Sequence, residues 1–229
     1  MVCLDNSEWM RNGDYIPTRL DAQQDAANLV SNAKTQQNPE NTVGVLSMAG
    51  SGRHSGATLL ASPTDDMGKI LASLHGVKIA GKLNFLEGVQ VAQLALKHRR
   101  NKNGGQRIVL FVGSPIDADA KSLVKAAKLL KKNNIAVDVV SMGETEDNRE
   151  KIQEFVDTVN SNDNSNLITI PPGVMPSDVL ISSPVIQQDM ANTGGAGGDF
   201  GSGAAAAPTG GDAGMQDWQE SDARRYEYL

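Results

Sequence analysis

Short, nearly continuous apolar runs alternate along the chain with longer stretches in which apolar residues recur every three or four positions. Short runs of this kind are typical of strands that are buried on both faces of a sheet. They predict strands at residues 2–4, 42–48, 57–61, 107–112, 136–141 and 167–170. The second and third of these strands are expected to form a hairpin across the glycine-rich loop 50–56.

The intervening stretches place apolar residues at positions i, i+3, i+4 and i+7, which is the spacing of one helix face. They predict helices around residues 26–33, 67–74, 84–98, 123–130 and 152–159. We expect N-caps at Asp21, Thr64 and Asp117, and stops at Gly76 and at the pair Asn133-Asn134. Strands that alternate with single amphipathic helices predict a three-layer α/β domain with a mostly parallel sheet covered on both faces.

Composition divides the chain near residue 185. The last 39 of the 229 residues hold nine of the 23 glycines and carry six acidic against two basic side chains. They account for −4 of the formal charge of −6, so the front part is nearly neutral. We expect a folded domain at 1–185 and a flexible, Gly/Ala-rich acidic tail at 186–229, because the tail has few large apolar groups.

Several protein classes are excluded at this point. Cys3 is the only cysteine, so a disulfide framework and a thiolate zinc site are both excluded, and a reducing compartment fits. We find no apolar run long enough for a membrane span and no secretory signal. The small charge of the front domain gives no reason to expect nucleic acid as a partner.

The polar segment that directly follows the first predicted strand is the most informative one. In open parallel sheets, ligands bind beyond the carboxyl ends of the strands. Asp5 and Ser7 stand two residues apart there and could offer oxygen ligands to Mg²⁺. The same two residues could instead cap a turn and satisfy backbone groups.

Six segments of the chain, taken together, resemble one known family, the non-ATPase multiubiquitin-receptor subunits of the proteasome regulatory particle, in their N-terminal von Willebrand factor A domain. The resemblance runs in order from residue 1 to about residue 184. The segments are DNSEWMRNGDYIPTRLDAQQDA (5–26), NPENTVG (38–44), LALKHRRNK (94–102), FVGSP (111–115), KKNNIAVDVVSMGE (131–144) and ISSP (181–184).

The resemblance implies a six-stranded von Willebrand A fold that docks near the junction of the lid and base subunits, in the cytoplasm and nucleus. It implies a role in ubiquitin-dependent proteolysis, with short helices in a separate tail binding polyubiquitinated proteins. No catalysis and no cofactor belong to the family.

The same fold suggests a metal site, and the residues argue against one. Adhesion-type A domains hold a divalent ion with Asp-x-Ser-x-Ser, a loop Thr and a further Asp. Asp5 and Ser7 match, but Trp9 takes the third position, Glu87 falls near the loop Thr, and no carboxylate follows the fourth strand before Asp117. We therefore expect no metal.

The segment after the first strand then becomes a candidate protein interface. Asp5 is the first choice for a docking residue, with Asn6, Ser7 and Glu8 around it. Arg19 could serve the interface or pair with a neighbouring carboxylate within the domain. No ubiquitin-binding or catalytic residue is assigned.

Two groups of basic residues have no assigned function. The first, Lys97 to Lys102, ends a predicted helix, where cations suit the helix dipole, and an acidic-partner site is the alternative. The second consists of lysines on a solvated helix face: Lys121, Lys125, Lys128, Lys131 and Lys132. We find no phosphate-loop motif and no nucleophile–base pair, so no enzyme is expected.

Both ends depart from the family pattern. Only residues 2–4 separate Met1 from Asp5, so the central first strand should be short, and we interpret this as an isoform, a gene-model fragment or a true variant. Residues 190–229 contain no apolar-x-x-Ala-x-x-x-Ser motif, since Glu227 stands four positions after Ala223. We expect this chain to dock without binding ubiquitin by itself.

Three hypotheses follow. The leading one is a proteasome regulatory-particle subunit. The second is a metal-dependent, ligand-binding A domain of the adhesion type. The third is a small α/β hydrolase or nucleotide-dependent enzyme, which the missing motifs disfavour.

Overall fold

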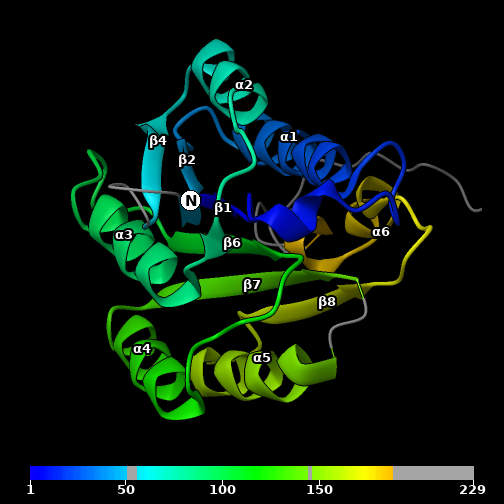
Figure 1. The fold of residues 1–229 in the computed structure, drawn as a ribbon. Helices are drawn as coiled ribbons and strands as arrows, with labels where there is room; N and C mark the ends of the chain where they lie inside the picture. The colour runs from blue at the N-terminus through cyan, green and yellow to red at the C-terminus, as the bar shows by residue number, and fades with distance from the viewer. Residues whose placement is uncertain (51–55, 144–145, 188–229) are drawn as a thin grey trace, which may run out of the picture. The chain divides into compact units, whose positions relative to one another are not determined.

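The computed structural model describes residues 1–50, 56–143 and 146–187, and a six-stranded sheet lies at its centre (Figure 1). The strand order is β4-β2-β1-β6-β7-β8, in which only the β2–β4 pair is antiparallel. The strands are β1 (Val2–Leu4), β2 (Val43–Ser47), β4 (Thr58–Thr64), β6 (Gln106–Val112), β7 (Ile135–Met142) and β8 (Asn166–Ile170). This mostly parallel arrangement confirms the predicted fold class.

Helices cover both faces of the sheet, as Figure 1 shows. One face carries α1 (Arg19–Gln37), α2 (Met67–His75) and α6 (Pro176–Ile181). The other face carries α3 (Phe85–Lys97), α4 (Ala120–Lys132) and α5 (Glu146–Val159). The two core layers are mainly aliphatic, and Phe85 and Phe155 pack edge to face within one of them. No helix in the described ranges is long and apolar enough to cross a membrane.

Strand β1 lies in the middle of the sheet although it is only three residues long. Val2 is opposite Val45 of β2 on one side and Val109 of β6 on the other. All three residues of β1 are buried. The strand therefore delivers Asp5 directly to the carboxyl end of the sheet, between the loops that follow β2 and β6.

All six predicted strands and all five predicted helices are present, with longer bounds in most cases. Three small elements were not predicted: the 3₁₀ helix η1 (Glu8–Arg11), helix α6, and a separate two-stranded sheet of β3 (Ala49–Gly50) and β5 (Lys82–Leu83). Most of the glycine-rich loop, residues 51–55, and the acidic tail from residue 188 onward lie outside the described residues.

The predicted N-caps were wrong by two or three residues. Thr18, Asp66 and Asp119 cap α1, α2 and α4, and each side chain accepts a hydrogen bond from the backbone N–H three residues later. The stops at Gly76 and Asn133 are confirmed as C-caps.

Candidate functional site

The carboxylate of Asp5 is the centre of the site at the carboxyl end of β1. One oxygen accepts a hydrogen bond from the Ser7 N–H at 2.9 Å. The other accepts from the Gly113 N–H at 3.0 Å and from the Ser114 hydroxyl at 2.6 Å, both in the loop that follows β6. Asp5 has no exposed surface. The carboxylate therefore ties the end of β1 to the end of β6.

Further hydrogen bonds hold the same segment. The side chain of Gln23 in α1 forms two hydrogen bonds with the backbone of Asp5, at 3.1 and 2.9 Å. The Asn6 amide donates to the carbonyl oxygens of Ala49 and Lys78, and its oxygen accepts from the Ala49 N–H at 2.8 Å. Asn6 thus links β1 to β3 and to the loop after α2.

Arg19 lies buried at the start of α1 and braces the neighbouring loops. Its guanidinium pairs with Asp14, with the Nε donating to a carboxylate oxygen at 3.0 Å. It also donates to the carbonyl oxygen of Gly113 and lies 5.8 Å from the centre of the Tyr15 ring. Of the two roles predicted for Arg19, the structure supports pairing with a carboxylate within the domain.

The segment before Arg19 extends this bracing to β7 and β8. The Tyr15 hydroxyl donates to the carbonyl oxygen of Ile170 at 2.6 Å and accepts from the Gly143 N–H at 2.6 Å. The carbonyl oxygen of Asp14 accepts from the Gly173 N–H at 2.9 Å. The ends of four parallel strands are therefore fixed by side chains from residues 5–19.

Burial changes the role of most predicted docking residues. Asp5, Asn6 and Ser7 are buried, so they cannot contact a partner with their side chains as the sequence led us to expect. The Ser7 hydroxyl has no hydrogen-bond partner among the described residues. Glu8 is exposed and pairs with Arg11 at 2.7 Å. The docking role of this segment stays a prediction, in which the buried residues position the surface.

Two exposed apolar side chains at this end were missed as contact residues. Trp9, in η1, is 54% exposed and Ile16 is 75% exposed. A sequence signal existed for the first, because Trp9 follows directly after the polar strand end where serine is expected in metal-binding A domains. Large exposed side chains beside a rigid loop are typical of protein interfaces.

The residues here do not fit a divalent cation. N–H and O–H donors already occupy the Asp5 carboxylate. Glu87 accepts a hydrogen bond from the Asn84 amide at 2.7 Å at the start of α3, and Asp117 is exposed. Within the ranges that the structure describes, no three His, Cys, Asp or Glu side chains form a group that could hold a metal. The metal-dependent adhesion hypothesis is therefore disfavoured.

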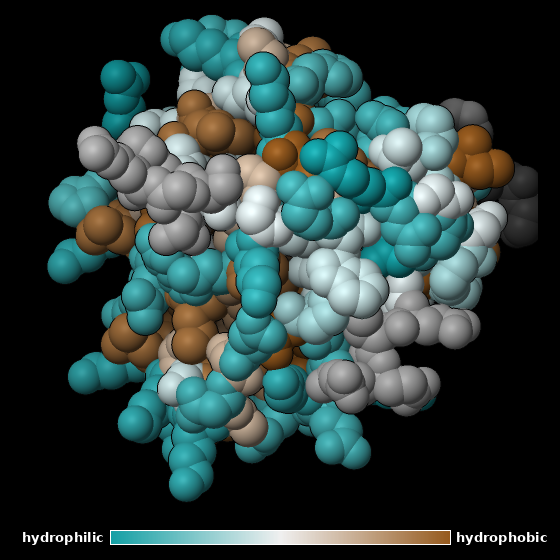
Figure 2. All heavy atoms as spheres, viewed as in Figure 1, coloured by the Kyte–Doolittle hydropathy of each residue, from teal (hydrophilic) through white to brown (hydrophobic). Residues whose placement is uncertain are grey.

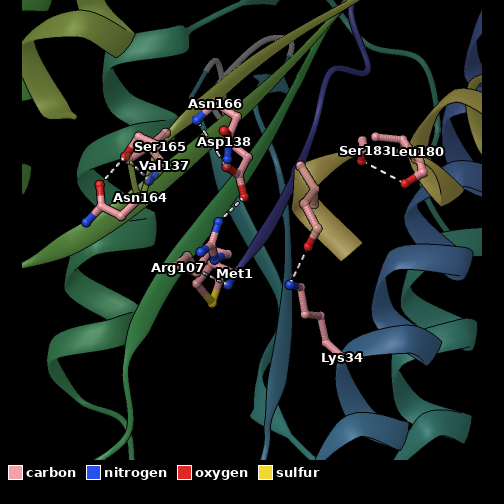
Figure 3. A network of polar contacts seen from close by, with 11 residues as sticks. Met1, Lys34, Arg107, Val137, Asp138, Asn164, Ser165, Asn166, Leu180 and Ser183 are labelled. Carbon is pink, nitrogen blue, oxygen red and sulfur yellow. Dashed lines mark hydrogen bonds and ion pairs between the residues drawn. The ribbon is translucent and has the colours of Figure 1, made fainter. Parts of the chain in front are cut away.

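The amino end of the sheet holds a second buried carboxylate, which the sequence analysis did not single out (Figure 3). One oxygen of Asp138 in β7 pairs with Arg107 of β6 at 2.5 Å. The other accepts from the backbone and side-chain N–H groups of Asn166 in β8, at 3.2 and 2.8 Å. The α-amino group of Met1 donates to the Arg107 carbonyl oxygen at 2.8 Å, and burial lowers the pKa of this amine to about 6.

A cleft of about 510 Å³ opens at this amino end, and three of its lining residues are basic. Lys34 donates to the Val185 carbonyl oxygen at 2.5 Å, and Arg99 donates to that of Leu96 at 3.0 Å. The third, Arg107, holds Asp138. These cations serve the fold, so the carboxyl end remains the better candidate for function.

Comparison with known proteins agrees with this geometry. Residues 1–115 match the family model of the von Willebrand factor type A domain. The chain is 52% identical over 196 residues to the 26S proteasome non-ATPase regulatory subunit 4 homolog of Oryza sativa subsp. japonica, which covers 85% of this chain and 48% of the relative. It is 51% identical over 192 residues to the Arabidopsis thaliana homolog, with 82% and 49% covered.

A solved structure agrees with the same assignment. The crystal structure of the SpRpn10 VWA domain is 46% identical, with a TM-score of 0.74, and the match covers 82% of this chain and 95% of that one. The present chain spans about half the length of the two plant relatives.

Proposed function

The chain belongs to the family of 26S proteasome non-ATPase regulatory subunit 4, named Rpn10 in yeasts, and from this premise we propose that it is a non-catalytic docking subunit of the proteasome regulatory particle. Its partners in this proposal are lid and base subunits near their junction. The relatives are named as non-ATPase regulatory subunits, which supports the absence of catalysis. The cytoplasm and nucleus are the proposed location, on the resemblance alone.

One observation carries the docking part of the proposal: the exposed Trp9 lies on a segment that buried hydrogen bonds hold in place. Asp5 and Asn6 fix the chain directly before it. A preorganised tryptophan loses little conformational entropy on binding, and truncation of such residues commonly weakens protein interfaces strongly. Trp9, with Ile16 and Glu8 nearby in the chain, forms the proposed contact set.

The experiment is incorporation of variants into regulatory particles that lack this subunit, followed on native gels. Trp9→Ala should weaken association by about tenfold or more, while the melting temperature stays unchanged because the side chain is exposed. Leu60→Ala, which truncates an exposed apolar residue on the edge strand β4, is the matched control and should associate normally. Normal incorporation of Trp9→Ala would overturn the proposed contact.

Asp5→Arg tests the supporting network behind Trp9. An arginine cannot accept the three hydrogen bonds that Asp5 accepts, so the loops after β1 and β6 should lose their arrangement. We expect both a lower melting temperature and weaker incorporation. Unchanged co-migration of this variant with the particle would contradict the positioning role.

The family's connection to ubiquitin is proposed only at the level of the assembly. The chain would support ubiquitin-dependent proteolysis through its place in the particle, with no ubiquitin-binding residue assigned. Pull-down of the isolated chain with long polyubiquitin chains should give no retention. Strong retention would reveal a ubiquitin site in this chain and restore a direct receptor role.

A further inference from the structure

Positive charge is concentrated in one segment of this acidic chain. Residues 97–132 contain ten Lys and Arg residues against Asp117 and Asp119, a surplus of eight, whereas the whole chain carries −6. The remaining residues therefore carry −14. The segment runs from the end of α3 through β6 to the end of α4, and parallel packing on one face of the sheet places the carboxyl ends of both helices at the amino end of the sheet.

The helix dipole explains only part of this charge. Lys131 and Lys132 occupy the last turn of α4, where cations are stabilising. Lys121 lies in the first turn, where a cation is unfavourable, and Lys125 lies in the middle. Helix α4 contains no acidic residue, so Lys121 and Lys125 repel each other at i, i+4, although the N-cap carboxylate of Asp119 attracts Lys125.

Most of these lysines also form no close ion pair within the described part of the domain. Lys131 donates to the Asn160 carbonyl oxygen at 2.8 Å. Lys121, Lys125, Lys128 and Lys132 are exposed and form no ion pair with a carboxylate in the part of the chain that the structure describes. Asp119, the exposed N-cap of α4, attracts Lys125, and most of this charge remains available to a partner.

Two exposed leucines accompany the lysines. Leu94 of α3 is 55% exposed and Leu129 of α4 is 48% exposed. Leu129 lies on the flank of α4 away from Lys131, which reaches the end of α5, so Leu129 faces the α3 side. Figure 2 shows apolar side chains over α3 and at its junction with α4, with hydrophilic side chains projecting from α4 around them.

We propose that Leu94, Lys97, Lys125, Leu129 and Lys132, here called the α3–α4 surface, dock an acidic amphipathic helix of a partner protein. Glutamates and aspartates on that helix would meet the exposed lysines, and its apolar face would cover the two leucines. Nucleic acid is the less suitable partner, because the α3–α4 surface contains leucines and no aromatic side chain for base stacking. The surface is separate from Trp9, and the proposal does not depend on the proposed function.

The test uses the full chain and a fluorescein-labelled synthetic helix of 16 residues, with leucines along one face and glutamates on both flanks, followed by fluorescence anisotropy. Leu94→Ser with Leu129→Ser should weaken binding at least about tenfold, and so should Lys125→Glu with Lys132→Glu. The matched controls, Leu60→Ser and Lys78→Glu on other surfaces, should bind within about twofold of the unaltered chain.

Two further probes separate the alternatives. A peptide with its leucines replaced by serine should bind at least about tenfold more weakly, and a 20-nucleotide oligothymidylate should bind no better than that peptide. Melting curves verify that the variants are folded. Any of three results would overturn the proposal: leucine variants that bind as tightly as the unaltered chain, tighter binding of the oligonucleotide than of the leucine peptide, or no binding of the leucine peptide at concentrations up to about 1 mM. Trp9→Ala should bind the peptide normally, so failure here leaves the docking proposal intact.

Discussion

The two ends of the sheet each bury an aspartate, and they hold its charge in different ways. Asp5 at the carboxyl end receives only neutral donors, two backbone N–H groups and one hydroxyl. Asp138 at the amino end is paired with the guanidinium of Arg107 and with Asn166. Both carboxylates are fully buried.

This difference means that the two carboxylates position different parts of the molecule. Donors to Asp5 come from loops, so its carboxylate determines where those loops lie and presents Trp9 next to them. Donors to Asp138 come from the adjacent strands β6 and β8, so its carboxylate fixes the register of three strands. A buried charge can therefore organise a recognition surface at one end and the sheet itself at the other.

The largest effect should follow from removing the cation at the amino end. Arg107→Met leaves the Asp138 charge buried and unpaired, and should lower the free energy of unfolding by about 3–5 kcal/mol. Urea denaturation measures this loss in the free energy of unfolding. Arg11→Met is the matched control, because the Arg11–Glu8 pair is more than half exposed on both sides, and it should lose at most about 1 kcal/mol. Equal losses for the two variants would show that Arg107 does not compensate a buried charge.

A smaller loss should follow at the carboxyl end from Asp5→Asn. The amide has one acceptor oxygen, so at least one of the donors Ser7, Gly113 and Ser114 faces an NH₂ group and stays unsatisfied, at a cost of about 1–3 kcal/mol. Chemical denaturation tests this, with the exposed Asp157→Asn as the control. An unchanged free energy of unfolding for Asp5→Asn would mean that the loops are held without this carboxylate.

The bracing by Arg19 is tested by comparing two glycines that have the same φ of +81°. Alanine at either position is strained, because a residue with a Cβ rarely adopts this positive φ. A Cβ at Gly143 would also lie 2.8 Å from the Arg19 guanidinium, whereas nothing lies within 4 Å of a Cβ at Gly173. Gly143→Ala should therefore lose about 1–3 kcal/mol more than Gly173→Ala in thermal or urea unfolding. Equal losses would show that the Arg19 contact is easily displaced.

The smallest effect concerns the thiol of the central strand β1. Burial raises the pKa of the Cys3 thiol in β1 from 9.0 to about 12. The native thiol stays protonated while the unfolded one ionises, so this contribution to stability is present below about pH 9 and is lost as the pH rises toward 12. By pH 10 the loss should be about 1 kcal/mol.

Other groups titrate in the same range, so the measurement is a difference between two proteins. Unfolding free energies of the unaltered chain and of Cys3→Ala are compared from pH 7 to pH 10. The alanine variant should show the shallower decline. Parallel curves would indicate that the thiol ionises within the folded sheet.

The sequence predicted elements well where the pattern is local. Apolar runs and i, i+3, i+4 spacings depend on near neighbours, and the strands and main helices followed from them. The caps failed because several capping residues stand close together, and Thr18 rather than Asp21 faces the free N–H groups of α1. Helix α6 is too short for a helical period to be visible.

The sequence predicted where the site lies but not which of its residues are buried. Asp5 was recognised from its position after a strand, yet its donors Gly113 and Ser114 lie more than a hundred residues away in the chain, so its burial could not be read from local sequence. Asp138 was overlooked because it interrupts an otherwise apolar strand, and its partner Arg107 becomes visible only when β6 and β7 are paired.

The central position of β1 has a consequence for how the chain folds during synthesis. Its three residues are synthesised well before one of the strands that must flank them, because β6 begins about a hundred residues later. Strands β6, β7 and β8, by contrast, follow one another as consecutive β-α-β units. Contacts between distant segments form slowly because a long loop must close first. Strand β1 is therefore expected to be among the last elements to reach its place, unpaired on its β6 side until that later part of the chain has been synthesised.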